Sequence, residues 1–131
     1  SMVKENIKLS ILWVAIVAGM SAHSIMDMTP LFWNVDIAIS NDGVAPMPML
    51  VLMAVVSLTI PMIGLLLSLY ACKRSYKMIH FFLAALLALF CTAHSAELLF
   101  SFELPQLFIH PMLVILSITL VYEAWKWYKK V

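Results

Sequence analysis

The sequence predicts an all-α integral membrane protein, a bundle of four transmembrane helices. Hydrophobic residues make up 64% of its 131 residues and charged residues only 11%, whereas a soluble domain needs roughly 25% charged residues to cover its surface. Four apolar stretches are each close to the ~20 residues that a helix needs to cross a bilayer. Runs as continuous as these can satisfy their backbone groups in lipid only as helices.

Taken in order along the chain, the apolar stretches define the four helices and the segments between them. We expect helices over these residues: 9–28, 49–70, 78–102 and 107–125. A polar loop (29–48), a basic segment (73–77) and a short turn (103–105) connect them. The first stretch exceeds the roughly 7–15 apolar residues of a signal peptide, so we retain it as a helix. The whole chain, residues 1–131, is then a single four-helix domain.

The charges predict how the bundle is oriented. All the Lys and Arg residues fall before the first helix, in the basic segment or at the C-terminal end: Lys4, Lys8, Lys73, Arg74, Lys77, Lys126, Lys129 and Lys130. With four crossings these clusters share one side, which the positive-inside rule makes cytoplasmic. The opposite side carries acidic residues and no Lys or Arg: Asp27, Asp36, Asp42, Glu97 and Glu103. We therefore expect an inner-membrane protein with both termini in the cytoplasm.

Similar strings in the two halves of the chain favour a duplicated hairpin. Residues 20–24 (MSAHS) are similar to residues 91–95 (CTAHS), and residues 48–52 (PMLVL) to residues 111–115 (PMLVI). The matches fall at corresponding places in two hairpins of the same orientation. A parallel repeat relates such halves by a pseudo-two-fold axis along the membrane normal. This axis would bring the first and third helices face to face.

Three histidines fall at one depth in the predicted bundle. At 1.5 Å per residue, His23, His94 and His110 lie about 22–26 Å from the nearest basic anchors of their helices. Asp27 follows His23 by four residues and Glu97 follows His94 by three, so each carboxylate shares a helix face with its histidine. Ionisable groups inside a membrane are costly and are by default candidates for function. Hydrogen bonding between helices, as plain structural glue, is the alternative interpretation.

The residue types in this cluster point to a metal ion. Imidazole nitrogen and carboxylate oxygen are common ligands of Zn²⁺ and of iron, and bundle metal sites are built from facing helices in this way. We expect zinc first, with copper or iron next. Met20 and Cys91 lie three residues before His23 and His94, and their softer sulfur atoms would suit copper. His80 lies near the basic segment, where we expect an interfacial residue with no special role.

Other cofactors and partners fit the sequence less well. A formal charge of +1 gives no electrostatic grip on nucleic acid, and no Gly-rich phosphate loop is present. Cys72 and Cys91 form no CxxC motif, so a thiol redox pair is not indicated. Haem could be held between His23 and His94, but its propionates would face only acidic groups at that end. We therefore disfavour haem.

The sequence leads to a small membrane protein that binds a transition metal, in sensing, handling or transport. The lipid bilayer and a metal ion are the expected partners, and a homo-oligomer or a larger membrane complex stays open. A zinc hydrolase acting on a lipid or peptide also stays open, with Asp27 or Glu97 as the general base. No HExxH motif supports an enzyme, and no catalytic residue is assigned. A proton-coupled transporter, an interaction subunit without metal and a b-type haem protein complete the range of functions that the sequence allows.

Overall fold

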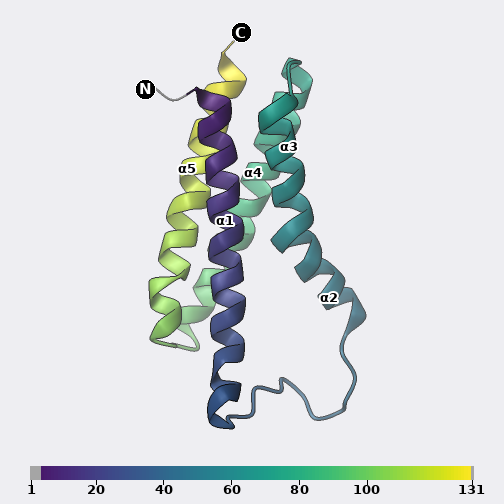
Figure 1. The fold of residues 1–131 in the computed structure, drawn as a ribbon, viewed down its shortest axis with the longest axis vertical. Helices are drawn as coiled ribbons and strands as arrows, with labels where there is room; N and C mark the ends of the chain where they lie inside the picture. The colour runs from purple at the N-terminus through teal and green to yellow at the C-terminus, as the bar shows by residue number, and fades with distance from the viewer. Residues whose placement is uncertain (1–3, 131) are drawn as a thin grey trace.

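The computed structural model describes residues 4–130, and over that range the chain is helical with no strand. The helices form four units, which run side by side along the long axis of the molecule (Figure 1). Their elements are α1 (Glu5–Met28) with η1 (Thr29–Trp33); α2 (Met47–Ala54), η2 (Val55–Thr59) and α3 (Ile60–Tyr70); α4 (Arg74–Ser95) with η3 (Ala96–Leu99); and η4 (Pro105–Phe108) with α5 (His110–Lys129). The predicted all-helical, four-helix fold is therefore confirmed for the described residues.

All four units are long and apolar enough to cross a membrane. They contain 29, 24, 26 and 25 residues, and a crossing needs about 20. Large apolar side chains also cover much of the outside of the bundle, as the residues of a membrane-embedded helix do. The internal repeat stays a prediction.

The helical units cover residues 5–33, 47–70, 74–99 and 105–129, so most of their boundaries differ by a few residues from the expected ones. The third unit stops at Leu99 rather than at residue 102. The last helix continues to Lys129, past the predicted end at residue 125. Trp127 is buried in this extra turn, so tertiary packing extends the helix beyond the apolar run.

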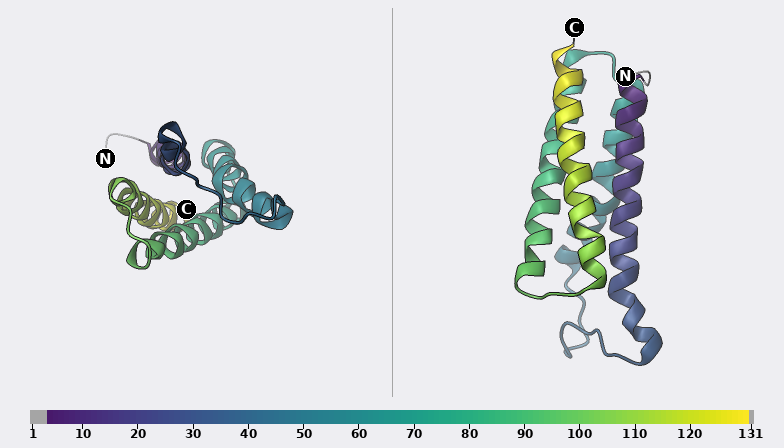
Figure 2. Two further views of the ribbon diagram at one scale, coloured as in Figure 1. Left: turned by 90° about the horizontal axis from the view of Figure 1, so that it is seen from below. Right: turned by 90° about the vertical axis from the view of Figure 1, so that its left-hand side faces the viewer.

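The helices pack as a ring in which α1 contacts α3 and α5, and α4 contacts the same two helices. Seen from below, they form a four-cornered bundle (Figure 2). α2 departs from it: all of its described residues are exposed, and Figure 1 shows it leaning away from the other helices. The departure begins at a π-helical turn, Val55–Thr59, just before Pro61. A π turn and a proline both interrupt the regular i→i−4 hydrogen bonds of a helix and bend it.

An apolar core fills the middle of the bundle. Ile16 of α1, Leu87 of α4 and Leu120 of α5 are fully buried there. Toward the end that holds both termini, Trp13 Nε1 donates a 2.8 Å hydrogen bond to Nε2 of His80. His80 is fully buried, so the expectation of an interfacial position is wrong. The indole supplies a partner for one ring nitrogen, whereas Nδ1 of His80 is buried without a hydrogen-bond partner among the described residues.

Candidate metal centre

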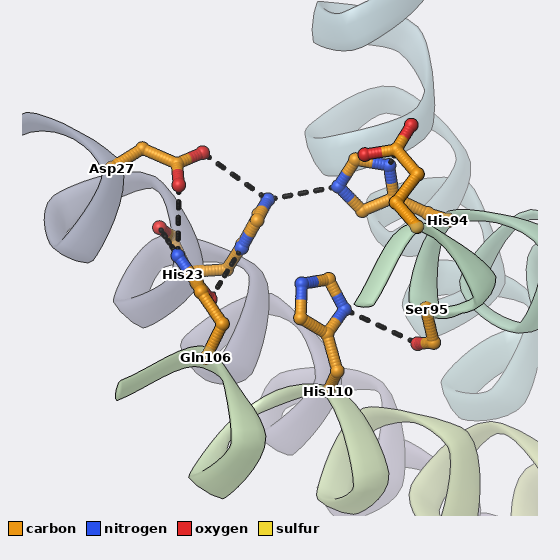
Figure 3. A network of polar contacts seen from close by, with 7 residues as sticks. His23, Asp27, His94, Ser95, Gln106 and His110 are labelled. Atoms are coloured by element: carbon orange, nitrogen blue, oxygen red, sulfur yellow. Dashed lines mark hydrogen bonds and ion pairs between the residues drawn. The ribbon is translucent and has the colours of Figure 1, made fainter. Parts of the chain in front are cut away.

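Three helices bring one histidine each to the same end of the bundle. His23 comes from α1, His94 from α4 and His110 from the first residue of α5. One donor nitrogen from each ring lies within 4.8 Å of the others, and the ring centroids are 4.6, 4.8 and 5.2 Å apart. Figure 3 shows the three rings turned toward one another. The three histidines, which the sequence places at one depth, therefore also lie next to one another.

Local structure explains why two of these rings meet. His94 lies one residue before the end of α4, and His110 opens α5 after the connection that reverses the chain. The hydroxyl of Ser95, at the end of α4, lies 3.2 Å from Nδ1 of His110. This contact fixes the start of α5 against the end of α4. His23 approaches from α1, which packs along α5.

The three rings turn the same nitrogen, Nδ1, away from the cluster, although their planes are tilted by 50–81° to one another. In each ring Nδ1 has a polar partner outside the cluster: Gln106 Oε1 at 2.8 Å for His23, Glu97 Oε1 at 3.6 Å for His94 and Ser95 Oγ at 3.2 Å for His110. Outer partners of this kind fix the ring orientation of a metal-binding histidine and raise its basicity as a ligand. The Nε2 atoms are left to face the interior of the cluster.

The spacing of the Nε2 atoms suits one small metal ion. Nε2 of His94 lies 2.9 Å from Nε2 of His23. In tetrahedral zinc sites the Zn–N bonds are about 2.0–2.1 Å long, which places two ligand atoms about 3.3 Å apart. The observed 2.9 Å and the 4.8 Å upper limit across the triad bracket this value, so small side-chain movements would close the rings around an ion.

The two carboxylates lie on different sides of the cluster. Oδ2 of Asp27 is 3.4 Å from Nε2 of His23, the ring nitrogen that faces the interior. Oε1 of Glu97 is instead 3.6 Å from Nδ1 of His94, the nitrogen that faces outward. Both were expected to be ligands, yet within residues 4–130 the group of mutually close donor atoms contains the three histidines alone. Asp27 therefore borders the metal position, whereas Glu97 braces His94 from behind.

The two sulfur side chains expected as softer ligands lie in or against the apolar core and not in the histidine cluster. Cys91 is buried in the apolar core, and Met20 is packed against that core. Within the described residues, the Cys91 thiol is not part of the group of close donor atoms. The cluster therefore consists of three imidazole nitrogens with the carboxylate of Asp27 beside them.

Gln106 is the polar residue that the sequence interpretation missed. Its side chain is buried, and it contacts both His23 and Asp27. A signal was present: Gln106 precedes His110 by four residues, the spacing that places two side chains on one helix face. An amide beside an apolar span is a candidate for the same polar cluster, because a buried amide needs partners.

The cluster is closed on one side and open on the other. His110 is buried, His23 is mostly covered, and the His94 side chain is 48% exposed. An ion can therefore reach the Nε2 atoms from the His94 side, and the neighbouring carboxylates attract a cation there. Three imidazoles that are neutral when they bind metal would hold one divalent transition-metal ion.

Comparison with protein-family models, with curated proteins and with solved structures finds no match for this chain. The geometry of the cluster therefore carries the functional interpretation.

Proposed function

We propose that this chain is an inner-membrane protein that binds a transition-metal ion, zinc first, at the extracytoplasmic end of its helical bundle. The observation that carries the proposal is that three imidazoles from three helices turn the same nitrogen toward one another. Each Nδ1 is engaged from outside, and each Nε2 faces the shared interior. Pairwise hydrogen bonding between helices explains the inward turn of His23 and His94, whose Nε2 atoms lie 2.9 Å apart, but it does not explain why His110 turns the same nitrogen inward.

The distribution of charge supports this orientation in the membrane. Both termini and the connection between α3 and α4 lie at one end of the bundle (Figure 1), and these segments hold all the Lys and Arg residues. At that end cations lie over aromatic rings, in pairs typical of a membrane interface: Arg74 with Tyr128, Lys77 with Trp127, Lys126 with Tyr122 and Lys129 with Trp125. The histidine cluster is at the opposite, acidic end.

The geometry favours a single ion over haem. Two axial imidazoles of a haem lie on opposite faces of the macrocycle. Here the facing nitrogens of His23 and His94 are only 2.9 Å apart, and the ring of His110 lies 4.6 Å from that of His23. The third ring occupies space that a porphyrin would need.

The apolar core favours metal binding at the outer face over passage through a single bundle. Leu113 lies one turn beyond His110, and Ile16, Leu87 and Leu120 are fully buried in the middle of the bundle. Within residues 4–130, the buried side chains between the cluster and His80 are mostly apolar, with Cys91 and Ser117 as the exceptions. Sensing or handling of metal outside the cytoplasm is therefore the form of the function that we favour.

Elemental analysis of protein purified without a His tag tests the proposal. We expect one zinc ion per chain after loading with Zn²⁺ and removal of excess metal. His23→Ala, His94→Ala and His110→Ala should each lose the ion, because two imidazoles hold zinc far more weakly than three.

His80→Gln is the matched control, since it removes an imidazole at the other end of the bundle but retains a polar side chain beside Trp13. This variant should keep the ion. Wild-type protein that binds no zinc, or zinc that stays bound in all three triad variants, would contradict the proposal.

A further inference from the structure

The buried amide of Gln106 connects two residues that border the metal position. Gln106 lies in η4 and is 3% exposed. Its Nε2 donates to Oδ1 of Asp27 at 2.8 Å and to the backbone carbonyl of His23 at 3.3 Å, and its Oε1 lies 2.8 Å from Nδ1 of His23. Both ends of the amide are therefore used, as a buried polar group requires.

These contacts determine which way round the amide lies. A carboxylate and a backbone carbonyl can only accept hydrogen bonds, so the NH₂ group of Gln106 must face them. The carbonyl oxygen of Gln106 then faces His23, where it can only accept. Nδ1 of His23 must consequently carry a hydrogen and donate it. In a neutral ring this leaves the lone pair on Nε2, the nitrogen that faces the cluster.

The same amide divides the two oxygens of Asp27 between two tasks. Oδ1 accepts from Gln106, while Oδ2 stays 3.4 Å from Nε2 of His23 (Figure 3). That separation matches the distance of about 3.3 Å between two ligands of one tetrahedral zinc ion. Glu97 has no such arrangement, because its carboxylate faces Nδ1 of His94 and its side chain is 72% exposed.

We propose that Gln106 is a positioning residue that presents Nε2 of His23 and Oδ2 of Asp27 to the metal. Asp27 then becomes the fourth ligand of a site made of three nitrogens and one oxygen. This inference rests on the proposed metal-binding function and refines it. The ligand class is a divalent ion that accepts tetrahedral N₃O coordination, such as Zn²⁺ or Co²⁺. Glu97 acts on His94 and stays outside the coordination sphere.

Cobalt spectroscopy tests the fourth ligand, because the intensity and position of the visible bands of Co²⁺ depend on its coordination number and ligands. We expect Asp27→Asn and Gln106→Leu to alter these bands as water replaces the carboxylate, and to lower the Co²⁺ affinity about 10–100-fold. Glu103→Gln is the matched carboxylate control, because Glu103 is exposed in the connection between α4 and α5, and its bands should stay as in the wild type. Asp27 is largely exposed, so Asp27→Asn should fold even if the buried Gln106→Leu variant does not.

Nitrogen NMR of the imidazoles gives a readout that does not depend on metal. In the metal-free wild type, neutral His23 should carry its hydrogen on Nδ1, and Gln106→Leu should remove that preference. Wild-type Co²⁺ bands that persist in both Asp27→Asn and Gln106→Leu would overturn this inference and leave the metal function intact. A wild type that binds neither Zn²⁺ nor Co²⁺ would overturn both. A His23 ring with its hydrogen on Nε2 would overturn the role of Gln106 alone.

Discussion

At the residue scale, metal binding by each imidazole depends on the contacts of its outward-facing nitrogen as well as on the inward-facing nitrogen that would bind the ion. Amide, carboxylate and hydroxyl groups take the three outward nitrogens, and their contacts differ in strength. The Gln106 contact is 2.8 Å long and buried, whereas Glu97 is exposed and 3.6 Å from its ring. We therefore expect His23 to be the most rigidly held ligand and His94 the most easily displaced.

The Ser95 contact allows a direct test at this scale. Ser95→Ala removes the hydroxyl that lies 3.2 Å from Nδ1 of His110, so the ring loses its outer partner while the inner ligands stay in place. We expect the zinc affinity to fall about tenfold, at the lower end of the range for such partners. Competition with a chromophoric zinc chelator measures this change.

Ser24→Ala is the control for this prediction. Ser24 also follows a histidine of the cluster by one residue, but it is exposed and neighbours His23, whose outer nitrogen is held by Gln106 instead. Its zinc affinity should stay within about twofold of the wild type. Equal losses in both serine variants would show that the hydroxyl of Ser95 has no specific role.

At the element scale, close approach between α1 and α3 depends on Gly64. A Cβ atom added at Gly64 would lie 2.3 Å from the indole ring of Trp13, well inside van der Waals contact. The rigid indole is itself held by its hydrogen bond to His80. Absence of a side chain at Gly64 thus lets the Trp13 ring lie directly against the α3 backbone.

Gly64→Ala should destabilise the protein by about 1–3 kcal/mol, the usual cost of overpacking a well-packed core. Gly19→Ala should cost less, because the atom that a Cβ would meet at 2.6 Å is the terminal methyl of the flexible Leu113 side chain. Thermal unfolding in detergent, followed by circular dichroism, compares the two variants. A Gly64→Ala protein at least as stable as Gly19→Ala would contradict the packing described for Trp13.

The helices also show which features of the fold could be predicted from the sequence. The four helices were predictable because apolar runs of membrane length have few alternatives to helix. The bend of the second helix was predictable only in part: Pro61 is visible in the sequence, but the π turn at residues 55–59 depends on local backbone geometry that hydropathy does not encode. His80 was misplaced because depth alone does not reveal a partner such as Trp13 on another helix.

Part of the metal cluster could likewise be predicted from the sequence, and part could not. The depth of the three histidines could be counted from the basic anchors, because helix rise is constant. The separate places of Asp27 and Glu97 could not, because both carboxylates follow their histidines at helical spacing. The carboxylate contacts are set by side-chain orientation and by Gln106, which enters from η4.

At the scale of the whole molecule, the ends of the bundle differ in chemistry. One end holds the termini, the cation–aromatic pairs and acidic residues that pair with lysines, as in Lys8 with Glu123. The other holds the histidine cluster and carries no Lys or Arg. Such asymmetry is expected of a protein inserted with one fixed orientation.

Cysteine labelling in intact cells tests this orientation. Cys72 is exposed in the connection between α3 and α4, so a membrane-impermeant maleimide should label it only after the cells are permeabilised. Ile39 is 98% exposed in the loop between α1 and α2. Ile39→Cys in a Cys72→Ser background should react from outside. The reverse labelling pattern would place the histidine cluster on the cytoplasmic side.

The most direct measurement of the metal centre is X-ray absorption at the zinc edge of the zinc-loaded wild-type protein. We predict a four-coordinate ion with three imidazoles and one oxygen, and no sulfur ligand. Sulfur scattering would move the ion to Cys91 or Met20, and an ion bound by fewer than three imidazoles would contradict the triad of His23, His94 and His110.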